Sequence, residues 1–197
     1  MKELILATNN KNKVSEMKEK LSKLGINVLS QSEAGINIDV DETGETFKEN
    51  AKIKAEAIYN LVKKPVLADD SGLCIDALDG APGVHSHRFA GEDATDQDRI
   101  NIVLDKLKNV PFEERTARFK CCVCFIDENG ENHYFEDTAE GIIADSPRGS
   151  NGFGFDPVFL FEGGDRTFAE FSKEEKNAVS HRGKAVAKFN DYISKII

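Results

Sequence analysis

The sequence predicts a mixed α/β fold, and two features carry this prediction. In the first half of the chain, short apolar runs alternate with apolar residues at three- and four-residue spacing, which indicates strands joined by helices. In the second half, an Asn-Gly turn at 129–130 connects two strand-like runs, which favours antiparallel pairing. The 197 residues suit one well-filled core and are short for two ordinary domains, so we expect a single domain over 1–197.

The individual elements follow from the spacing of apolar residues and from the turn residues between them. The expected strands are 3–7, 26–29, 65–68, 117–126, 134–135, 141–144 and 158–161. A first helix is expected to begin near Lys13 and to stop at Gly25, and the later helices are expected over 46–62, 96–107 and 183–196. The Gly- and Pro-rich stretches 79–91 and 148–157 are expected to be loops.

The stretch 67–72, with the sequence LADDSG, is the most informative one. A short apolar run ends abruptly in Asp69 and Asp70, which we therefore place at the tip of a buried strand. Adjacent acids repel and a buried unpaired carboxylate is costly, so a divalent cation such as Mg²⁺ explains the pair. Ligands of open α/β sheets bind beyond the carboxyl ends of strands. The alternative is that both acids cap a turn that Ser71 and Gly72 complete.

A turn that suits an anion follows the first expected strand. The stretch 8–13, with the sequence TNNKNK, connects a strand end to a helix N-terminus. Free backbone N–H groups and the helix dipole favour phosphate at such a place, and Lys13 adds a positive charge. The stretch is not a Walker A loop, because it lacks glycines. The alternative is an Asn-rich turn with a helix cap.

An acidic loop precedes the helix expected over 46–62. One of its acids is a candidate to join Asp70 on a metal ion; we favour Glu42 and keep Asp41 as the alternative. The other explanation is that acids are enriched near the first turn of a helix because of its dipole.

Two later stretches suit recognition of a base. The loop 148–157 holds three glycines, Phe153, Phe155 and Asp156, so that a ring can stack on a base and the acid can accept from ring N–H groups. The alternative is that both rings return to the core. Further along, Lys176 and the stretch 180–182 (SHR) suit an anion or a carbonyl oxygen, or else form a solvated charged face.

Composition argues against several classes of protein. The net charge of -9 disfavours a broad basic surface for nucleic acid. No apolar run has membrane-spanning length and the N-terminus lacks a signal-peptide hydrophobic region, so we expect no membrane partner and a cytoplasmic location.

Two motifs with metal-like spacing are not expected to bind metal. Cys121 and Cys124 lie in a strand-like run, where alternation directs them to opposite faces, so buried thiols are expected. His85 and His87 form an H-x-H pair in a loop with no evident third ligand nearby.

Together, these stretches indicate a Mg²⁺-dependent enzyme that acts on a nucleoside triphosphate. The same stretches give the chain a resemblance to the inosine triphosphate pyrophosphatase family, in particular its dITP/XTP pyrophosphatases. The matching segments arrive in family order and are 8–13, 42–44, 46–51, 68–73, 80–83, 91–96, 152–157, 175–176 and 180–183. One difference is Phe155, where many relatives carry Tyr; this removes a hydroxyl and keeps the ring.

The resemblance implies hydrolysis of ITP, dITP and XTP to the monophosphate and pyrophosphate, which keeps deaminated purines out of nucleic acids. It implies a homodimer and an elongated α/β fold, with a long mixed central sheet flanked by helices and an active-site cleft between two lobes. It implies that Glu42 and Asp70 bind Mg²⁺ and that Asp70 accepts the proton, with Asp69 as the second candidate. The implied substrate-binding residues are Thr8, Asn9, Asn10, Lys11, Asn12, Lys13, Ser71, Phe153, Gly154, Phe155, Asp156, Lys176, His181 and Arg182.

Three rival functions remain at this stage. A pyrophosphatase for pyrimidine nucleotides would use a similar fold and differ in its substrates. A non-catalytic nucleotide sensor would use the same turn and ring loop, although it needs no base such as the Asp69–Asp70 pair supplies. A nucleic-acid-binding module is disfavoured by the charge of -9.

Overall fold

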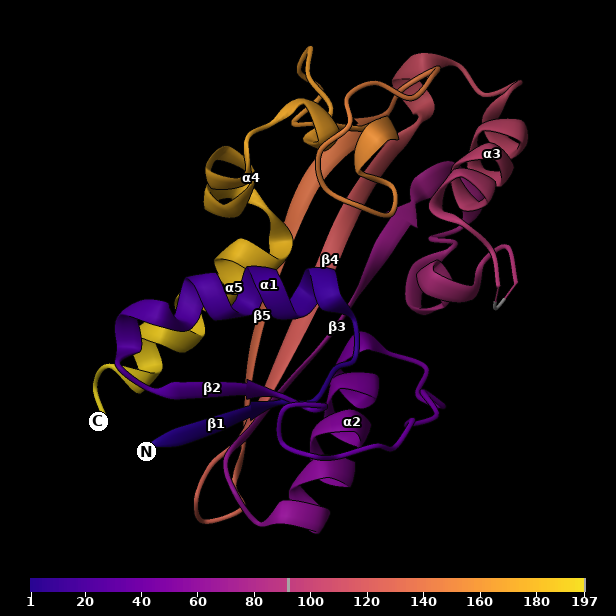
Figure 1. Cartoon of the computed structure of the whole chain (residues 1–197). Helices are drawn as coiled ribbons and strands as arrows, with labels where there is room; N and C mark the ends of the chain where they lie inside the picture. Colours follow the sequence, from indigo (N-terminus) through magenta and orange to yellow (C-terminus); the bar gives the residue numbers. More distant parts are fainter. Residues whose placement is uncertain (92, 197) are drawn as a thin grey trace. The chain divides into compact units, whose positions relative to one another are not determined.

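The computed structural model describes residues 1–91 and 93–196, apart from the side chain of Lys23. Glu92, which belongs to the matching segment 91–96, lies outside the described residues. Within this range a six-stranded sheet has the strand order β2-β1-β3-β4-β5-β6. The strands are β1 (Glu3–Leu6), β2 (Asn27–Ser30), β3 (Val66–Ile75), β4 (Thr116–Ile126), β5 (Asn132–Ile143) and β6 (Phe159–Phe161) (Figure 1). The α-helices are α1 (Lys11–Leu21), α2 (Phe47–Val62), α3 (Asp96–Leu107), α4 (Lys173–Val179) and α5 (His181–Ile193).

The predicted mixed α/β class is confirmed by the strand directions. Strand β1 runs parallel to both β2 and β3, whereas β5 runs antiparallel to β6. Parallel strands need a crossover connection, and α1 supplies one between β1 and β2. None of the helices in the described part of the chain is long and apolar enough to cross a membrane.

The chain divides into two compact units. Unit 1 consists of Met1–Asp70, Cys121–Asp137 and Lys184–Ile197, and unit 2 consists of Ser71–Lys120 and Thr138–Gly183. Strand β3 passes from unit 1 to unit 2 between Asp70 and Ser71, and β4 and β5 also contribute to both units.

Unit 1 has a hydrophobic core on each face of its strands. On one face, α1 and α5 pack with Met17, Leu21 and Phe189 against alternate residues of β1, β3 and β4. On the other face, α2 packs with the predicted inner-face residues Ala51, Ala55 and Ile58, while Phe47 is partly buried beside them. The two clusters explain why the strands of this unit are apolar on both sides.

Unit 2 is organised around one core. Helix α3 contributes Ile100, Val103 and Leu107, which pack with residues of β3, β4 and β5. The aromatic side chains of Phe119, Phe159 and Phe168 complete this core. Ring centroids of Phe119 and Phe159 lie 4.6 Å apart, within the range at which aromatic pairs attract each other.

Helix caps account for several of the boundaries. The side chain of Asn10 accepts from the backbone N–H groups of Asn12 and Lys13, so α1 begins two residues before the expected Lys13. Thr46 and Thr95 form capping boxes at the starts of α2 and α3, both of which begin within one residue of their predicted positions.

Strand β3 differs from the prediction. It does not end at the two acids but continues to Ile75, so that Asp69 and Asp70 lie in its middle. The polar stretch 69–72 interrupts the apolar run, yet Leu73 and Ile75 are fully buried and keep the chain extended. The strand tip predicted for these acids was therefore wrong.

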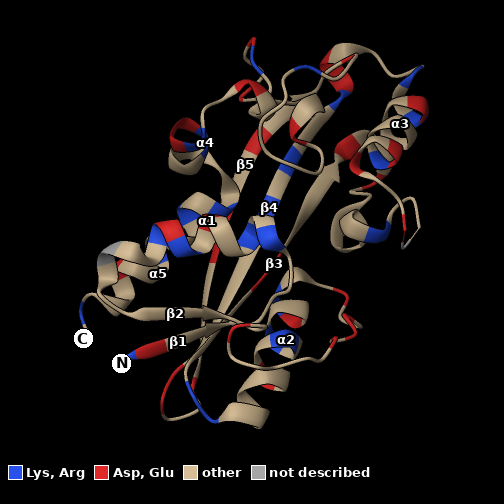
Figure 2. Ribbon diagram, viewed as in Figure 1, with Lys and Arg blue, Asp and Glu red and all other residues tan. Residues whose placement is uncertain are grey.

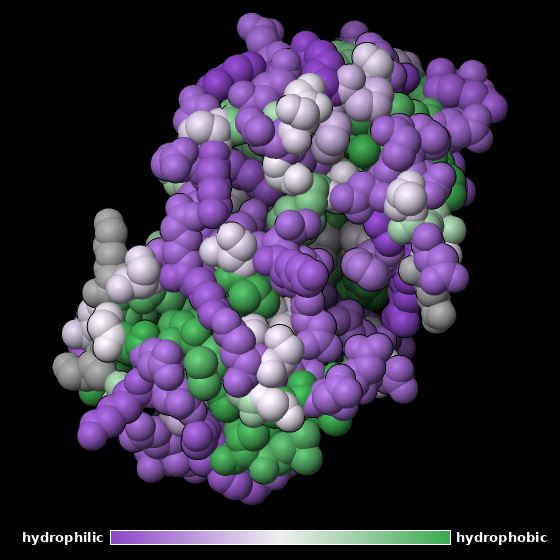
Figure 3. Space-filling view, in the orientation of Figure 1, coloured by the Kyte–Doolittle hydropathy of each residue, from purple (hydrophilic) through white to green (hydrophobic). Residues whose placement is uncertain are grey.

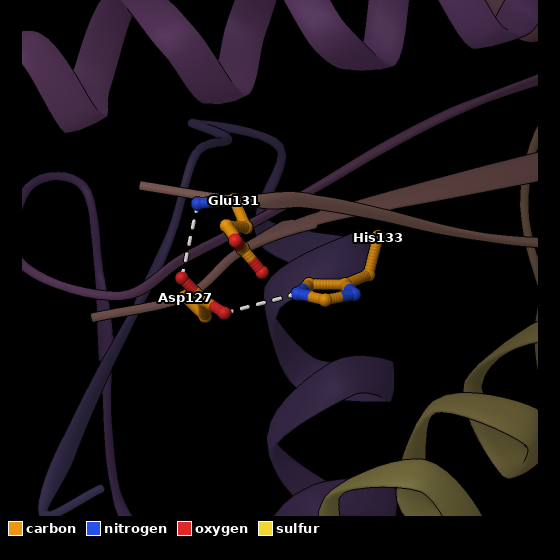
Figure 4. Close-up of side chains that lie close together, drawn as sticks. All are labelled: Asp127, Glu131 and His133. Carbon is orange, nitrogen blue, oxygen red and sulfur yellow. Dashed lines mark hydrogen bonds and ion pairs between the residues drawn. The ribbon is translucent and has the colours of Figure 1, made fainter. Parts of the chain in front are cut away.

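The second half also differs in one respect. The two short strands expected at 134–135 and 141–144 are parts of one strand, β5. The predicted hairpin between β4 and β5 is confirmed, and Asp127 organises its turn by accepting from the N–H groups of Asn129 and Glu131. The other carboxylate oxygen of Asp127 lies 3.0 Å from Nε2 of His133, as Figure 4 shows. These contacts give the Asp127–Glu131–His133 cluster a structural role in the hairpin.

Charges and apolar side chains are unevenly distributed. Acidic residues gather in the loop that leads into α2, and parts of this loop are red in Figure 2. The face shown in Figure 3 is mostly hydrophilic with smaller hydrophobic patches. Among the described residues, the exposed large hydrophobic side chains are Leu61, Phe112 and Ile196.

Candidate active site

Buried charge marks the candidate site. Ionisable side chains are seldom fully buried unless they have partners. Several of the residues predicted for the site are nevertheless at most 7% exposed, namely Asp69, Asp70, Asp156, Lys176, His181 and Arg182. They form two clusters: one lies in unit 1 around β3, and the other lies in unit 2 around the loop 152–157.

Asp69 and Asp70 belong to opposite faces of β3. Leu67 packs with the α1 and α5 cluster, and Ala68 packs with the α2 cluster. Because side chains alternate along a strand, Asp69 follows Leu67 and Asp70 follows Ala68. The two carboxylates therefore face different packing clusters, although the Asp69 charge still acts on Asp70 and on Lys54.

Asp69 is paired with the start of α1. Its Oδ2 lies 3.0 Å from Nζ of Lys13, whose side chain is 15% exposed. The pairing follows from the sheet, because Leu6 is in register with Leu67 and the chain after β1 thus emerges beside the middle of β3. Lys13 lies in the first turn of α1, so the positive end of the helix dipole is at the same place.

The predicted turn before α1 is compact. Oγ1 of Thr8 accepts from the Asn10 N–H, and Oδ1 of Asn10 accepts from Asn12 and Lys13. The helix-cap explanation is thus structurally correct for Asn10, and it is compatible with an anion site because a capped N-terminus retains other N–H groups. Asn9, Lys11 and Asn12 are exposed, the last two in the first turn of α1.

On the opposite face of β3, Asp70 is close to a lysine. Nζ of Lys54 lies 2.7 Å from Oε1 of Glu42 and 3.6 Å from Oδ1 of Asp70. Glu42 is partly buried at this cluster, whereas Asp41 is exposed. Of the two acids considered as partners of Asp70, Glu42 is therefore the one whose carboxylate shares a cation with it.

Burial and charge set the protonation of this cluster. Burial raises the pKa of Asp70; the Lys54 ammonium opposes this effect and the Glu42 carboxylate adds to it. Burial disfavours the ammonium of Lys54, but the charges of Asp70, Asp69 and Glu42 outweigh it and raise its pKa. The cluster therefore holds a cation between acidic oxygens, and such oxygens are the ligands that hard divalent cations prefer.

The Glu42 loop is held by α2. Oδ1 of Asn50, which is fully buried, accepts from the N–H of Gly44 at 2.8 Å. A Cβ atom on Gly44 would lie 2.7 Å from that Oδ1 and 2.6 Å from Cβ of Glu49, so a glycine is needed for the close approach. This contact orders the turn that directly follows Glu42.

Sequence reasoning missed Lys54. Its position gave a signal, because it directly precedes Ala55 on the helix whose inner face had been predicted, and a lysine beside a buried stripe needs an acidic partner. Its partners, Glu42 and Asp70, depend on the packing of α2 against β3, which the sequence alone does not show.

The second cluster surrounds Phe153 in unit 2. Oδ2 of Asp156 accepts from Nζ of Lys176 at 2.5 Å and from the N–H of Phe153 at 2.9 Å. Gly152 has φ +74°, and a Cβ atom there would lie 2.0 Å from the same Asp156 oxygen. Glycine at 152 therefore allows the carboxylate to reach the loop backbone.

Two cations face the Phe153 ring. Nζ of Lys176 lies 4.9 Å and Cζ of Arg182 lies 5.6 Å from its centroid, both within cation–π range. Arg182 also donates from Nη2 to Oγ of Ser71 at 2.8 Å. The structure thus brings together four of the predicted substrate-binding residues.

His181 and Arg182 lie in the first turn of α5, which begins two residues before the predicted helix. The expected break is confirmed at Ser180, which ends α4 and whose Oγ accepts from the N–H of Gly183. The His181 ring stacks on Phe119, with centroids 4.7 Å apart.

Phe155 does not display its ring as predicted. It is 4% exposed and packs in the core of unit 2, whereas Phe153 is only partly buried. The expectation that the loop presents two rings was therefore wrong for Phe155, whose ring is buried in the hydrophobic core of unit 2.

The two cysteines of the C-x-x-C motif lie on opposite faces of the sheet, as predicted. Cys121 packs on the α1 and α5 side and Cys124 on the α2 side, and both are free thiols. Burial raises the pKa of Cys124 to about 12, which makes the reactive thiolate rare. His85 and His87 are exposed.

Comparison with known proteins adds a family to this geometry. Residues 4–192 match the model of the Ham1 family. The chain is 48% identical over 193 residues to a dITP/XTP pyrophosphatase of Halalkalibacterium halodurans, which covers 98% of this chain and 100% of the relative. It is 50% identical over 194 residues to a dITP/XTP pyrophosphatase of Treponema denticola, with 96% of this chain and 97% of the relative covered.

Solved structures of Ham1 proteins are also similar to this chain. A HAM1 protein from Coxiella burnetii superposes with a TM-score of 0.90 at 44% identity and covers 99% of this chain and 100% of that one. The Ham1 protein of Staphylococcus aureus gives a TM-score of 0.89 at 39% identity, with both chains covered completely.

Proposed function

Because the chain belongs to the Ham1 family, we propose that it hydrolyses deaminated purine nucleoside triphosphates, namely ITP, dITP and XTP, to the monophosphate and pyrophosphate. Relatives that are about half identical over nearly the whole chain carry the name dITP/XTP pyrophosphatase. The observation that carries the proposal is the Glu42–Lys54–Asp70 cluster, which lies on the face of β3 opposite to the Lys13–Asp69 pair. Such an arrangement suits a polyanion and its counter-ion.

We assign Glu42 and Asp70 as the residues that hold Mg²⁺. Their carboxylates already share a cation, the Lys54 ammonium, so the cluster meets the charge requirement of a divalent ion. When bound, Mg²⁺ would neutralise phosphate oxygens and polarise the phosphorus under attack.

Asp70 is also the residue we assign as proton acceptor. Its carboxylate is buried in the middle of β3, beside the side chains of Glu42 and Lys54. The water oxygen bonds to the α-phosphorus, the bond from that phosphorus to the bridging oxygen breaks, and pyrophosphate leaves with the electron pair. Asp70 takes the proton of the water. The phosphates are held by the stretch 8–13 and by Ser71, with Lys13 and Lys54 as the cations nearest to the acids.

We assign binding of the purine base of the substrate to the second cluster, around Phe153. The ring of Phe153 stacks on the purine, while Arg182 donates to the 6-keto oxygen that distinguishes inosine and xanthine from adenine. Asp156, Lys176 and His181 line the same cluster, and the backbone of Gly154 and Phe155 continues it.

We propose that residues 1–197 form one pyrophosphatase domain, because the relatives named dITP/XTP pyrophosphatase align with nearly the whole chain. A homodimer and a cytoplasmic location belong to the proposal through the family resemblance and the nucleotide substrate. Membrane and nucleic-acid partners are not part of it, in keeping with the net charge of -9.

A pyrophosphate-release assay with Mg²⁺ tests the function. The panel is ITP, XTP, dITP, ATP, GTP, dTTP and UTP, with Asp70→Asn and Asp69→Asn as matched variants, because the two acids are adjacent but on opposite faces. We expect release from the deaminated purines, abolished in Asp70→Asn and only reduced in Asp69→Asn. Pyrophosphate release from dTTP or UTP instead would support a pyrophosphatase for pyrimidine nucleotides. Binding of ITP without pyrophosphate release would support a non-catalytic nucleotide sensor.

A further inference from the structure

The loop that carries Phe153 has a glycine on each side of the ring-bearing residue. Gly152 and Gly154 flank the phenylalanine, and both have positive φ values, +74° and +63°. Glycine loses more conformational freedom on ordering than other residues do, so a ring presented between two glycines keeps a fixed position only if the loop is held by other contacts. Two carboxylates supply such contacts.

One carboxylate holds each amide that flanks the Phe153 α-carbon. Oδ2 of Asp156 accepts from the N–H of Phe153 at 2.9 Å, and Oδ2 of Asp96 accepts from the N–H of Gly154 at 2.7 Å. The first amide belongs to the peptide plane before Phe153 and the second to the plane after it. Fixing both planes fixes φ and ψ of Phe153, and therefore the direction of its side chain.

Asp96 is itself held in place. Its Oδ1 accepts from Nη1 of Arg99 at 2.8 Å, and Nε of Arg99 donates to the carbonyl oxygen of His87 at 2.6 Å. Arg99 is a residue of α3 and is 7% exposed, so it is a rigid support for the carboxylate. All of these residues lie in unit 2.

We infer that Asp96 is a positioning residue for the base-stacking ring: it fixes Phe153 through the Gly154 amide and contacts no substrate itself. The inference rests on the proposed function only for its kinetic consequences. Hydrogen bonds to a carboxylate are stronger than those between neutral groups, so loss of this contact frees the second peptide plane.

The test compares three variants near the start of α3. Asp96→Ala removes the contact, Asp96→Asn keeps an oxygen that can accept from Gly154, and Asp98→Ala is the control. Asp98 lies in the same first turn but accepts from Thr95, so its loss weakens the helix cap without touching the loop. Any general effect on α3 is thus shared by Asp96→Ala and the control.

Two readouts separate positioning from stability. In the ligand-free protein, amide hydrogen exchange at Gly154 should be at least ten-fold faster in Asp96→Ala than in Asp98→Ala. In the kinetic assay, KM for ITP should rise about five- to ten-fold in Asp96→Ala with kcat changed less than two-fold, because stacking on a base is uniform binding. Asp96→Asn should recover part of both effects.

The outcomes are distinguishable. Equal exchange at Gly154 and equal KM in Asp96→Ala and Asp98→Ala would overturn the inference. Failure of the wild-type protein to hydrolyse ITP would instead refute the proposed function, and the exchange measurement would still decide whether Asp96 holds the loop. A fall in kcat with unchanged KM would also contradict a positioning role for the stacking ring.

Discussion

Nζ of Lys54 lies 3.6 Å from Oδ1 of Asp70, so the candidate proton acceptor already has a cation beside it. The same ammonium donates to Glu42 at 2.7 Å. A divalent ion bound by these two acids would compete with Lys54 for their oxygens. The lysine is then free to follow the negative charge of an arriving triphosphate, which links metal binding to substrate binding.

Replacing Lys54 by Met should therefore separate the two binding events. Without nucleotide, the variant should bind Mn²⁺ more tightly than the wild type does, because no ammonium occupies the acidic oxygens. Its kcat/KM for ITP should fall by about 10- to 100-fold, as expected when a charged hydrogen bond worth about 1.5–3 kcal/mol is lost. Electron paramagnetic resonance of free Mn²⁺ measures the first effect and pyrophosphate release the second.

Lys52→Met is the matched control for this prediction. Lys52 lies two residues away on α2, is 47% exposed and pairs with Glu56 rather than with the candidate site. It should change neither Mn²⁺ affinity nor catalysis. If Lys54→Met bound Mn²⁺ more weakly than the wild type, the competition described above would be refuted.

Selection of the base should depend on Arg182. This side chain is 3% exposed and approaches both Phe153 and Ser71. If the substrate were ATP, the Arg182 N–H groups would face the adenine amino group and would lack an acceptor there. Each buried donor without an acceptor weakens binding by about 1–3 kcal/mol. Arg182→Ala should therefore lower kcat/KM for ITP more than for ATP and narrow the ratio between them. Lys188→Ala, an exposed position on the same helix, serves as control; an equal fall for both nucleotides would remove Arg182 from base recognition.

The sequence predicted the residue types of both clusters but not their partners. Asp69 and Asp70 interrupt an apolar run, so local hydrophobicity indicated a strand end. The chain instead stays extended because Lys13 on α1 and Lys54 on α2 supply a cation on each face of β3. These two tertiary contacts join residues that are 56 and 16 positions apart, and no local pattern encodes them.

Other features were predictable because they are local. The inner face of α2 and the hairpin turn at 127–130 follow from short-range spacing, and the structure confirms them. Helices α2 and α3 also begin within one residue of their predicted positions. The family resemblance is confirmed as well, since it depends on many short segments in order. The burial of Phe155 was missed because a glycine-rich loop has no fixed alternation.

The buried Lys176–Asp156 pair should matter for stability. Both side chains are under 10% exposed and their charged atoms are 2.5 Å apart. Lys176→Met removes this ion pair from Asp156, and breaking a buried pair in this way costs about 3–5 kcal/mol. Urea unfolding should show this loss, whereas Lys173→Met, at an exposed position of α4, should be nearly neutral. The double variant with Asp156→Asn should recover part of the loss; full additivity would mean that the two residues do not interact.

Stability should also depend on pH through Asp76. Hydrogen bonds from Arg118 and Thr116 hold the pKa of this carboxyl below its ordinary value of 3.8. A depressed pKa means that the folded state favours the charged form. The contribution to the free energy of unfolding is therefore complete above the unfolded pKa and is lost as pH falls through the folded one. Asp76 is 44% exposed, so solvent screening keeps the contribution below about 1 kcal/mol.

The measurement is urea unfolding of wild type and Asp76→Asn at several pH values. The variant should be less stable by a constant amount between about pH 5 and pH 8. The difference should shrink as pH falls below about 4, because the wild-type carboxyl then becomes protonated, first in the unfolded and then in the folded state. Asp79→Asn, three residues further along, gives the background effect of removing an acid from this segment. A difference that stays constant down to about pH 2 would show that the Arg118 contact does not act through the charge of Asp76.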